Sequence, residues 1–250
     1  MKDTKRTSRS SVYFISDVHL GIDTAKTSAD REAILISWLH TVSTDATAIY
    51  IVGDLFDYWF EYKSVVPQGY FKLFSTLHRI IETGVSIYYL KGNHDMWHKS
   101  YMTENIGVTL IDGPIEVQID GRTFCIAHGD GLGPGDWKYK MIKSILSNPF
   151  FQKLFSLIHP TIGLSMMKYM SKKSRQGHDE ESSSIDTHIQ YCLDTLAQRP
   201  DIAYFIMGHL HKPTLEILND QAIYINLGDW TDQFSYAQWD GSDVKLLHWT

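Results

Sequence analysis

Hydrophobic and polar positions follow two different periods in the first third of the chain. Runs of β-branched and aromatic residues over 12–16, 48–52 and 85–90 are typical of buried strands. Apolar residues recur at helical spacing over 30–42 and 68–82, which predicts a helix in each interval. This β-α-β-α-β order predicts parallel strands joined by right-handed helical crossovers.

A second set of strands is predicted after residue 107. Asp120-Gly121 is a strong hairpin signal between strands at 116–119 and 123–127. Further strand-like runs, separated by turn residues, cover 204–207, 214–218, 222–225, 236–239 and 244–248. Two sheets packed face to face, with helices outside them, accommodate all of these strands. The expected fold class is therefore α/β, a four-layer αββα sandwich.

Residues 136–197, between the two halves, are expected to form a helical insertion that caps the domain. Apolar side chains stand at helical spacing on both sides of a break at His159-Pro160: Phe150, Phe151, Leu154, Phe155 and Ile158 before it, and Ile162, Met166 and Met170 after it. An ordinary helical hairpin packed on the core would show the same pattern. A further amphipathic helix is expected at about 183–196. We expect one domain over 12–250 that contains this insertion, and a disordered tail over 1–11.

Composition narrows the class of protein. The 250 residues are 43% hydrophobic, which supports a sizeable core and excludes disordered and fibrous chains. Two cysteines, Cys125 and Cys192, make neither a disulfide framework nor a thiolate zinc site. The apolar stretch after the polar N-terminus is too short for a signal peptide, and no window has the length and apolarity of a membrane span. These features predict a cytoplasmic protein.

The charge of the chain is unevenly distributed. Net charge is −6, but residues 137–177 contain seven lysines, one arginine and no acid, which leaves 15 basic and 29 acidic residues elsewhere. An acidic body with one cationic, apolar segment argues against nucleic-acid binding and favours a local anionic partner, such as a membrane surface or a phosphorylated substrate. The alternative is a solvated helical face with no partner.

Polar residues that contribute nothing obvious to packing follow five of the predicted strands. Each cluster alone is typical of a capped strand end or a turn. Because the carboxyl ends of neighbouring strands converge, the clusters are expected to meet at one edge, where open α/β sheets bind ligands. Asp, Asn and His side chains suit first-row dications, and seven ligands fit two ions better than one. The seven candidates are Asp17, His19, Asp54, Asn93, His128, His209 and His211.

The order and spacing of these clusters resemble the calcineurin-like metallophosphoesterase superfamily. The motifs are Asp17-x-His19, Gly53-Asp54-x-x-Asp57, Gly92-Asn93-His94-Asp95, His128-Gly129 and Gly208-His209-x-His211. The resemblance implies that Asp17, His19, Asp54 and His211 hold one metal, and that Asp54, Asn93, His128 and His209 hold the other. It implies that Asp54 bridges the two ions and that a bridging hydroxide attacks phosphorus.

The neighbours of the ligands are assigned supporting roles. His94 is placed to stabilise charge on the phosphate or to protonate the leaving oxygen, and Asp95 is expected to hold its imidazole in the required tautomer. Asp57 is expected to support the site or the fold. The other seven histidines, at 40, 78, 98, 159, 178, 188 and 248, are interpreted as surface or packing residues.

Longer stretches around the motifs resemble the branch that contains UDP-2,3-diacylglucosamine diphosphatase. These stretches are Gly53–Trp59, His128–Leu132, Gly208–Pro213 and Leu227–Trp230. The resemblance implies cleavage of the pyrophosphate to UMP and 2,3-diacylglucosamine 1-phosphate, in the synthesis of lipid A. It also implies two divalent ions, manganese by analogy although zinc or iron would be accepted, and a peripheral position on the cytoplasmic face of the inner membrane through 137–177. The implied substrate contacts are Asn93, His94, Asp136, Tyr139, Ser171, Arg175 and His209.

This chain departs from that branch at two points, and three other functions therefore remain open. The branch has Arg at the position of His94, and its Asn and Lys beyond the insertion helix have Arg175 as their nearest match here. A titratable His suits an alkoxide leaving group better than a pyrophosphate. The alternatives are a soluble phosphodiesterase or nucleotide pyrophosphatase of the same superfamily, a protein phosphatase, and a non-enzymatic metal-binding scaffold.

Overall fold

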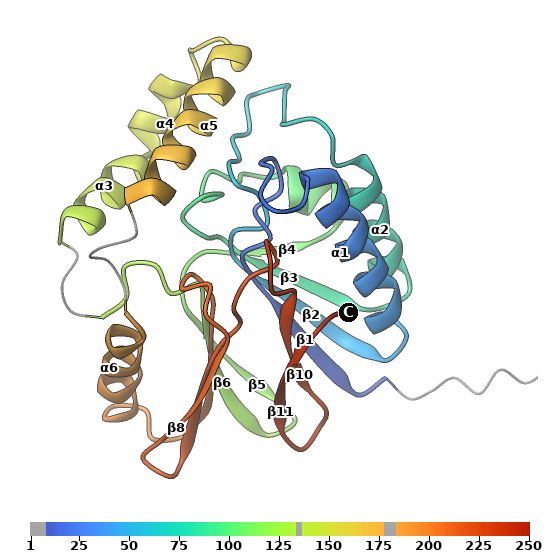
Figure 1. Cartoon of the computed structure of the whole chain (residues 1–250), viewed down its shortest axis with the longest axis vertical. Coiled ribbons are helices and arrows are strands. Elements are labelled where there is room, and N and C mark those ends of the chain that lie inside the picture. The colour runs from blue at the N-terminus through green and yellow to red at the C-terminus, as the bar shows by residue number, and fades with distance from the viewer. Residues whose placement is uncertain (1–8, 134–136, 178–183) are drawn as a thin grey trace, which may run out of the picture.

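Two mixed sheets lie back to back at the centre of the structure (Figure 1). The computed structural model describes residues 9–133, 137–177 and 184–250, apart from the side chains of Lys138 and 174–177. The first sheet has the order β11-β10-β1-β2-β3-β4 and the second β5-β6-β7-β9-β8. The strands of the first sheet are β1 (Ser11–Ile15), β2 (Ala46–Val52), β3 (Ser86–Leu90), β4 (Thr109–Ile111), β10 (Ser235–Trp239) and β11 (Val244–His248). Those of the second are β5 (Ile115–Ile119), β6 (Arg122–Ala127), β7 (Ile202–Met207), β8 (Thr214–Leu218) and β9 (Ala222–Asn226).

The strands that lead to the polar motifs are parallel neighbours. β1, β2, β3 and β4 run parallel in the first sheet, and β6, β7 and β9 do so in the second. Alternate residues of β1 face opposite sides: Val12 and Phe14 enter the core between the sheets, whereas Tyr13 and Ile15 face the helices. Because both faces are buried, the strands are hydrophobic throughout, as the sequence pattern indicates.

Helices cover the outer faces of both sheets. α1 (Ser28–Val42) and α2 (Phe71–Glu82) pack on the first sheet, and α6 (Ile185–Leu196) packs on the second through Cys192 and Leu196. A short π-helix, η1 (Met102–Ile106), precedes β4. The four layers confirm the expected αββα sandwich. The expected extent of the cap is wrong, because α6 forms one outer layer of the sandwich and does not belong to the cap (Figure 1).

The cap consists of three helices that stand beyond the carboxyl ends of the strands (Figure 1). They are α3 (Trp137–Ser147), α4 (Pro149–Phe155) and α5 (Pro160–Gly177). Asn148 ends α3 and caps α4, because its side chain accepts a hydrogen bond from the Phe150 nitrogen and Pro149 occupies the first helical position. The Trp97 indole donates to the Leu146 carbonyl at 2.8 Å, and the Phe155 ring packs on Trp97 at 5.0 Å. These contacts attach the cap to the loop after β3.

Two further details differ from the expectations. The pattern of residues 109–111 is too short to predict β4, which pairs with β3 through three residues. Residues 9–11, assigned to a disordered tail, are ordered: Arg9 bonds to Thr83 and the Ser10 nitrogen donates to Asp45 at 3.0 Å. Residues 1–8 lie outside the described part of the chain.

Candidate functional site

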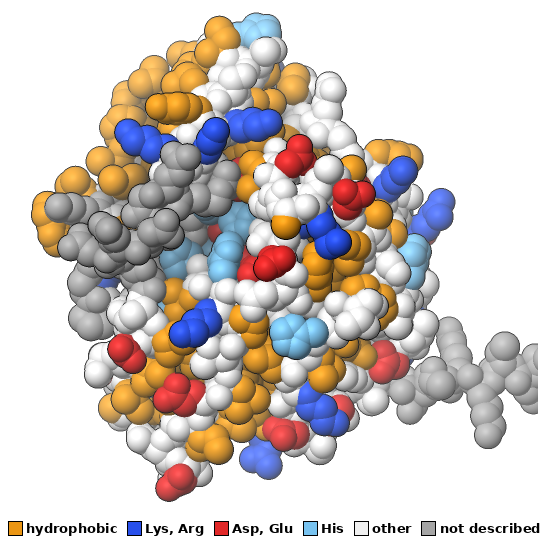
Figure 2. Space-filling model, in the orientation of Figure 1, with side chains coloured by type: hydrophobic (Ala, Val, Ile, Leu, Met, Phe, Trp, Pro, Cys, Tyr) orange, Lys and Arg blue, Asp and Glu red, His pale blue; other side chains and the backbone are white. Residues whose placement is uncertain are grey.

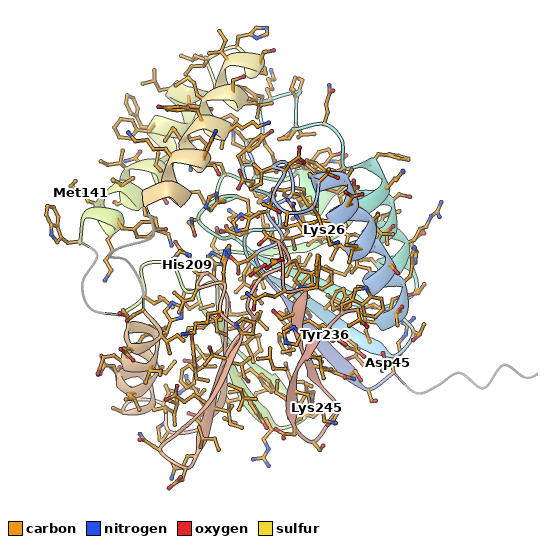
Figure 3. The ribbon with its side chains drawn as sticks, viewed as in Figure 1. Lys26, Asp45, Met141, His209, Tyr236 and Lys245 are labelled. Atoms are coloured by element: carbon orange, nitrogen blue, oxygen red, sulfur yellow. The ribbon has the colours of Figure 1, made fainter. Side chains whose placement is uncertain are left out.

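The five polar motifs meet at the carboxyl ends of strands from both sheets. Three follow β1, β2 and β3 of the first sheet, and two follow β6 and β7 of the second. Figure 3 shows His209 at this edge, between the sheets and the cap. Three groups have potential ligand atoms within 4.8 Å of one another: Asp17–His19–His211, Asp17–Asp54–His128 and His19–Asp54–His94. The structure therefore brings together side chains that are up to 194 positions apart in the sequence.

The first candidate metal position lies after β1. His211 Nε2 is 3.2 Å from Asp17 Oδ1 and 3.1 Å from His19 Nε2. His19 Nε2 is also 3.8 Å from Asp54 Oδ2, so the Asp54 carboxylate reaches this group. Asp17 and His19 are almost fully buried, whereas His211 is partly open to solvent.

The second candidate position lies on the other side of Asp54. His128 Nε2 is 3.3 Å from Asp54 Oδ2 and 3.1 Å from Asn93 Oδ1. His128 Nδ1 is 2.8 Å from the Val52 carbonyl, which fixes the ring so that Nε2 faces the carboxylate. The His209 ring lies 5.3 Å from that of His128. Asp54 is thus placed between the two groups, as the bridging role requires.

Several of these ligands have an unusual backbone conformation. Asp17, His19, Asp54, His209 and His211 have φ between 48° and 69°, in the left-handed region that residues with a Cβ rarely occupy. Strained backbone of this kind clusters at functional sites, where the surrounding structure holds it. The local hydrogen bonds do so here: the Asp17 nitrogen donates to the Gly53 carbonyl at 3.1 Å, and the His19 nitrogen donates to the Asp54 carbonyl at 3.0 Å.

Glycines let the motif backbones approach the ligand side chains. A Cβ at Gly53 would lie 2.4 Å from His128 Nδ1, and one at Gly92 would lie 2.1 Å from Asp54 Oδ1. Both distances are far below van der Waals contact. The motifs therefore require glycine before Asp54 and Asn93, because the backbone there lies too close to a ligand side chain to leave room for a Cβ.

Buried acids and imidazoles in this cluster shift one another's protonation. Burial acts to lower the pKa of His19, yet the neighbouring carboxylates of Asp17 and Asp57 raise it to about 10. Burial acts to raise the pKa of Asp17, yet His211 and His19 hold it well below its usual range. The pKa of Asp54 is lowered in the same way, against burial, by His128 and His94. The acids are therefore ionised and attract positive charge into the site.

The arrangement fits divalent cations. Among the described side chains, the buried Asp17 Oδ1 is one of the few oxygens that make no hydrogen bond. The Nε2 atoms of His19 and His211 lie 3.1 Å apart, and both lie within 3.7 Å of Asp17 Oδ1. A cation between these atoms would satisfy all three, and mixed carboxylate, amide and imidazole donors suit first-row dications.

The prediction that Asp95 holds the His94 ring is wrong. The Asp95 carboxylate accepts hydrogen bonds from the Gly92 and Phe56 nitrogens and from the Tyr89 hydroxyl, and it does not contact the His94 ring. His94 Nδ1 lies instead 3.0 Å from the Asp57 carbonyl. Asp95 therefore fixes the turn that carries Asn93 and His94, because the backbone around it needs a buried acceptor.

A cavity lies beside His128, and none of the described residues expected to contact the substrate is among those that line it. The cavity has a volume of about 310 Å³, and Lys91, Met96, Lys143 and Gln152 are among its lining residues. The Tyr139 hydroxyl donates to Asp130 at 2.6 Å, so this expected contact lies next to the cavity. Asp136 lies outside the described residues, and the side chain of Arg175 is not described. Ser171 is buried against the His94 side of the site.

Sequence reasoning missed Arg31, which supports the loop after β1. Its fully buried guanidinium donates to the carbonyls of Val18, His19, Ile22 and Lys26 and to the Thr24 hydroxyl. This fan of bonds holds the backbone of His19 in place. An arginine in an amphipathic helix normally points to solvent, so nothing in the sequence pattern distinguishes it.

Sequence comparison places the chain in a family. A model for calcineurin-like phosphoesterases matches residues 10–213, a span that includes all seven candidate ligands. The chain belongs to the calcineurin-like phosphoesterase family. The resemblance based on the five motifs is thus confirmed. The protein is a metal-dependent hydrolase of phosphoester or phosphoric anhydride bonds, and its family binds a dinuclear metal centre.

Curated relatives of this phosphoesterase match nearly its whole length. It is 31% identical over 260 residues to a UDP-2,3-diacylglucosamine hydrolase of Porphyromonas gingivalis, with 95% of this chain and 97% of the relative covered. It is 30% identical over 244 residues to a UDP-2,3-diacylglucosamine hydrolase of Yersinia pseudotuberculosis, with 95% and 98% covered. Among solved structures, the E. coli phosphoesterase Yfce gives a TM-score of 0.47 at 12% identity, over 95% of this chain and 92% of that one.

Proposed function

We propose that this phosphoesterase hydrolyses the pyrophosphate of UDP-2,3-diacylglucosamine to UMP and 2,3-diacylglucosamine 1-phosphate. One observation supports this proposal above the others: an apolar helical cap stands directly over the strand ends that carry the metal ligands (Figure 1). A substrate with a charged pyrophosphate and two acyl chains needs both surfaces within one molecular length. The names of the curated relatives point to the same substrate.

The ligand residues divide between two ions that share Asp54. Asp17, His19, Asp54 and His211 would hold one, and Asp54, Asn93, His128 and His209 would hold the other. When bound, two such ions supply an activated water for attack on phosphorus and neutralise the phosphate oxygens. Manganese is our expectation for both positions.

The chain's own residues position the substrate and move a proton. In its protonated form His94 carries a proton on each ring nitrogen: Nδ1 donates to the Asp57 carbonyl, and Nε2 would deliver its proton to the leaving oxygen. The cavity of about 310 Å³ beside His128 offers hydrogen-bonding groups to the polar part of the substrate. The expected contacts at Asp136 and Arg175 belong to the same proposal.

The outer face of the cap is proposed to dock on the inner membrane. Figure 2 shows hydrophobic side chains gathered over the cap, with basic residues beside them. Trp137, Phe150 and Leu157 are 66%, 69% and 78% exposed. The exposed lysines of the cap helices are Lys140, Lys153, Lys168, Lys172 and Lys173. Apolar residues flanked by lysines suit the boundary of an anionic leaflet. Among the described helices, none is long and apolar enough to cross a bilayer.

Vesicle binding tests the docking surface. Phe150→Ser together with Leu157→Ser should weaken sedimentation with phosphatidylglycerol vesicles, because each buried side chain contributes about 2 kcal/mol. Phe71→Ser is the matched control, since Phe71 is 82% exposed on α2, away from the cap. Equal loss of binding in both variants would contradict a specific role for the cap.

The substrate proposal is tested by following UMP release. UDP-2,3-diacylglucosamine and bis(p-nitrophenyl) phosphate are offered separately, with manganese and mild detergent, and UMP is quantified by chromatography. Efficient release of UMP from the lipid is the expected result. Turnover of the aryl diester alone would overturn the lipid assignment and leave the di-metal hydrolase.

His94 favours one second candidate, a phosphodiesterase acting on a soluble substrate. A histidine that can donate a proton helps an alkoxide leave more than it helps a phosphate. Activity on soluble diesters that is insensitive to detergent and to charge reversal in 137–177 would support this candidate.

A further inference from the structure

Ser171 connects the cap to the proton-donating side of the site. It belongs to α5, and its buried hydroxyl donates to Asp57 Oδ2 at 2.6 Å. The same oxygen lies 3.1 Å from His94 Nδ1. The three residues come from the loop after β2, the loop after β3 and the cap, so their contact forms only when the cap is in place.

The hydrogen bonds fix the orientation of the His94 ring. Because the Asp57 carbonyl is only an acceptor, the proton between them belongs to Nδ1. Ser171 donates its own proton to the Asp57 carboxylate, so its oxygen acts as an acceptor toward the Nδ1 proton. Nε2 of His94 has no hydrogen-bond partner among the described residues, and 10% of the side chain is exposed. The ring is therefore held from one side and left available on the other.

We propose that Ser171 is a positioning residue that aligns His94 for proton donation. Packing of the cap against the loops after β2 and β3 is thereby coupled to the chemical step. This inference rests on the proposed role of His94 in the phosphoesterase reaction. In that step, the oxygen of a water forms a bond to phosphorus while the bond from phosphorus to the leaving oxygen breaks. His94 enters the step as the imidazolium; its Nε2 proton goes to the leaving oxygen while Nδ1 keeps its own, the proton of the attacking water goes to solvent, and Nε2 regains a proton from solvent.

Two other roles for Ser171 predict different behaviour. As a substrate contact, the role implied by the family resemblance, it would affect binding of the lipid. As a purely structural bond, it would affect all substrates alike. Its hydroxyl proton is directed to Asp57, on the core side of α5, which favours the positioning role.

The test compares two leaving groups: phenolate, which needs a proton to leave readily, and p-nitrophenolate, which does not. Methyl p-nitrophenyl phosphate and methyl phenyl phosphate are hydrolysed by the manganese-loaded full-length enzyme, its Ser171→Ala variant and its His94→Ala variant. The ratio of the two kcat values is measured on the same preparation, so partial loss of folded protein does not change it. Ser165→Ala is the control, because Ser165 is exposed on the same helix and its hydroxyl donates to the Thr161 carbonyl of that helix.

Ser171→Ala should lower kcat for the phenyl ester about five- to tenfold and leave kcat for the p-nitrophenyl ester within about twofold, with KM unchanged. Adding Ser171→Ala to His94→Ala should have no further effect, since Ser171 acts through His94. Equal losses on both esters, or an additive effect in the double variant, would overturn the proposal. A change confined to KM would identify a substrate contact instead. Because neither ester is a lipid, failure to release UMP would reject the proposed substrate without affecting this result.

Discussion

One added methyl group at Gly92 tests the geometry of the metal site directly. A Cβ there would lie 2.1 Å from Asp54 Oδ1 and 2.6 Å from the Asp54 backbone nitrogen. Backbone atoms cannot rotate away, so Asp54 and the 92–95 turn must separate by roughly 1 Å to reach normal contact. That movement carries Asn93 and His94 away from the bridging carboxylate, whose Oδ1 accepts from the His94 nitrogen at 2.9 Å.

The expected loss in Gly92→Ala is larger in catalysis than in stability. Overpacking of this kind costs about 1–3 kcal/mol, which lowers the melting temperature of a domain this size by roughly 2–12 °C. Displacement of reacting groups by about 1 Å costs on the order of 100-fold in rate. We therefore expect a folded protein with about 1% of wild-type kcat/KM and reduced metal content.

The assay measures hydrolysis of bis(p-nitrophenyl) phosphate, metal content by mass spectrometry, and thermal unfolding. Gly241→Ala is the control: Gly241 has φ of 94°, and a Cβ added there would have no neighbouring atom within 4 Å, in the turn between β10 and β11. It loses about 1–2 kcal/mol from backbone strain but keeps the site intact. Full activity and metal content in Gly92→Ala would refute the reasoning.

Three further predictions concern the ligands and their support. Asp54→Ala should abolish metal binding and turnover together, whereas His94→Ala should slow turnover and spare metal content; mass spectrometry and kinetics separate the two, and the reverse pattern would reject both roles. Arg31→Met should lower the free energy of unfolding by about 3–5 kcal/mol in urea titrations, because five hydrogen bonds to the loop after β1 are lost; a change under about 1 kcal/mol would contradict its supporting role. Removal of metal by a chelator should lower the melting temperature by about 5–10 °C, and manganese should restore it, because bound ions stabilise only the folded site. An unchanged melting temperature would count against a metal at Asp17.

The sequence allowed the sandwich and the meeting of the motifs to be predicted, because both depend on local patterns. Hydrophobic runs buried on two faces identify strands, and parallel strands place their carboxyl ends together. The ligand clusters therefore converge whatever the details of the loops. The position of Asp54 between the two groups of ligands, in contrast, was predicted only from the family resemblance.

The parts that were missed depend on contacts between distant segments. α6 has the same amphipathic pattern as a cap helix, and only packing of Cys192 and Leu196 on the second sheet assigns it to the sandwich. His94 contacts Asp57 and not the expected Asp95, because the loops after β2 and β3 lie against each other. The spacing of residues in the sequence does not specify how these loops pack. Side-chain direction in loops is set by tertiary contacts, so sequence patterns do not specify it.

The left-handed backbone at five candidate ligands lowers the stability of the fold at positions where catalysis requires these side chains. Glycine adopts this conformation without penalty, whereas Asp and His carry a cost of about 1 kcal/mol at each position. Replacing His209 by glycine would relieve this strain, whereas the ionised forms of Asp17 and Asp54 are stabilised by the histidines around them. Mutational selection for thermal tolerance of the metal-free chain would thus enrich glycine at His209, a position where activity requires a ligand. A library screened for stability alone should lose this ligand first.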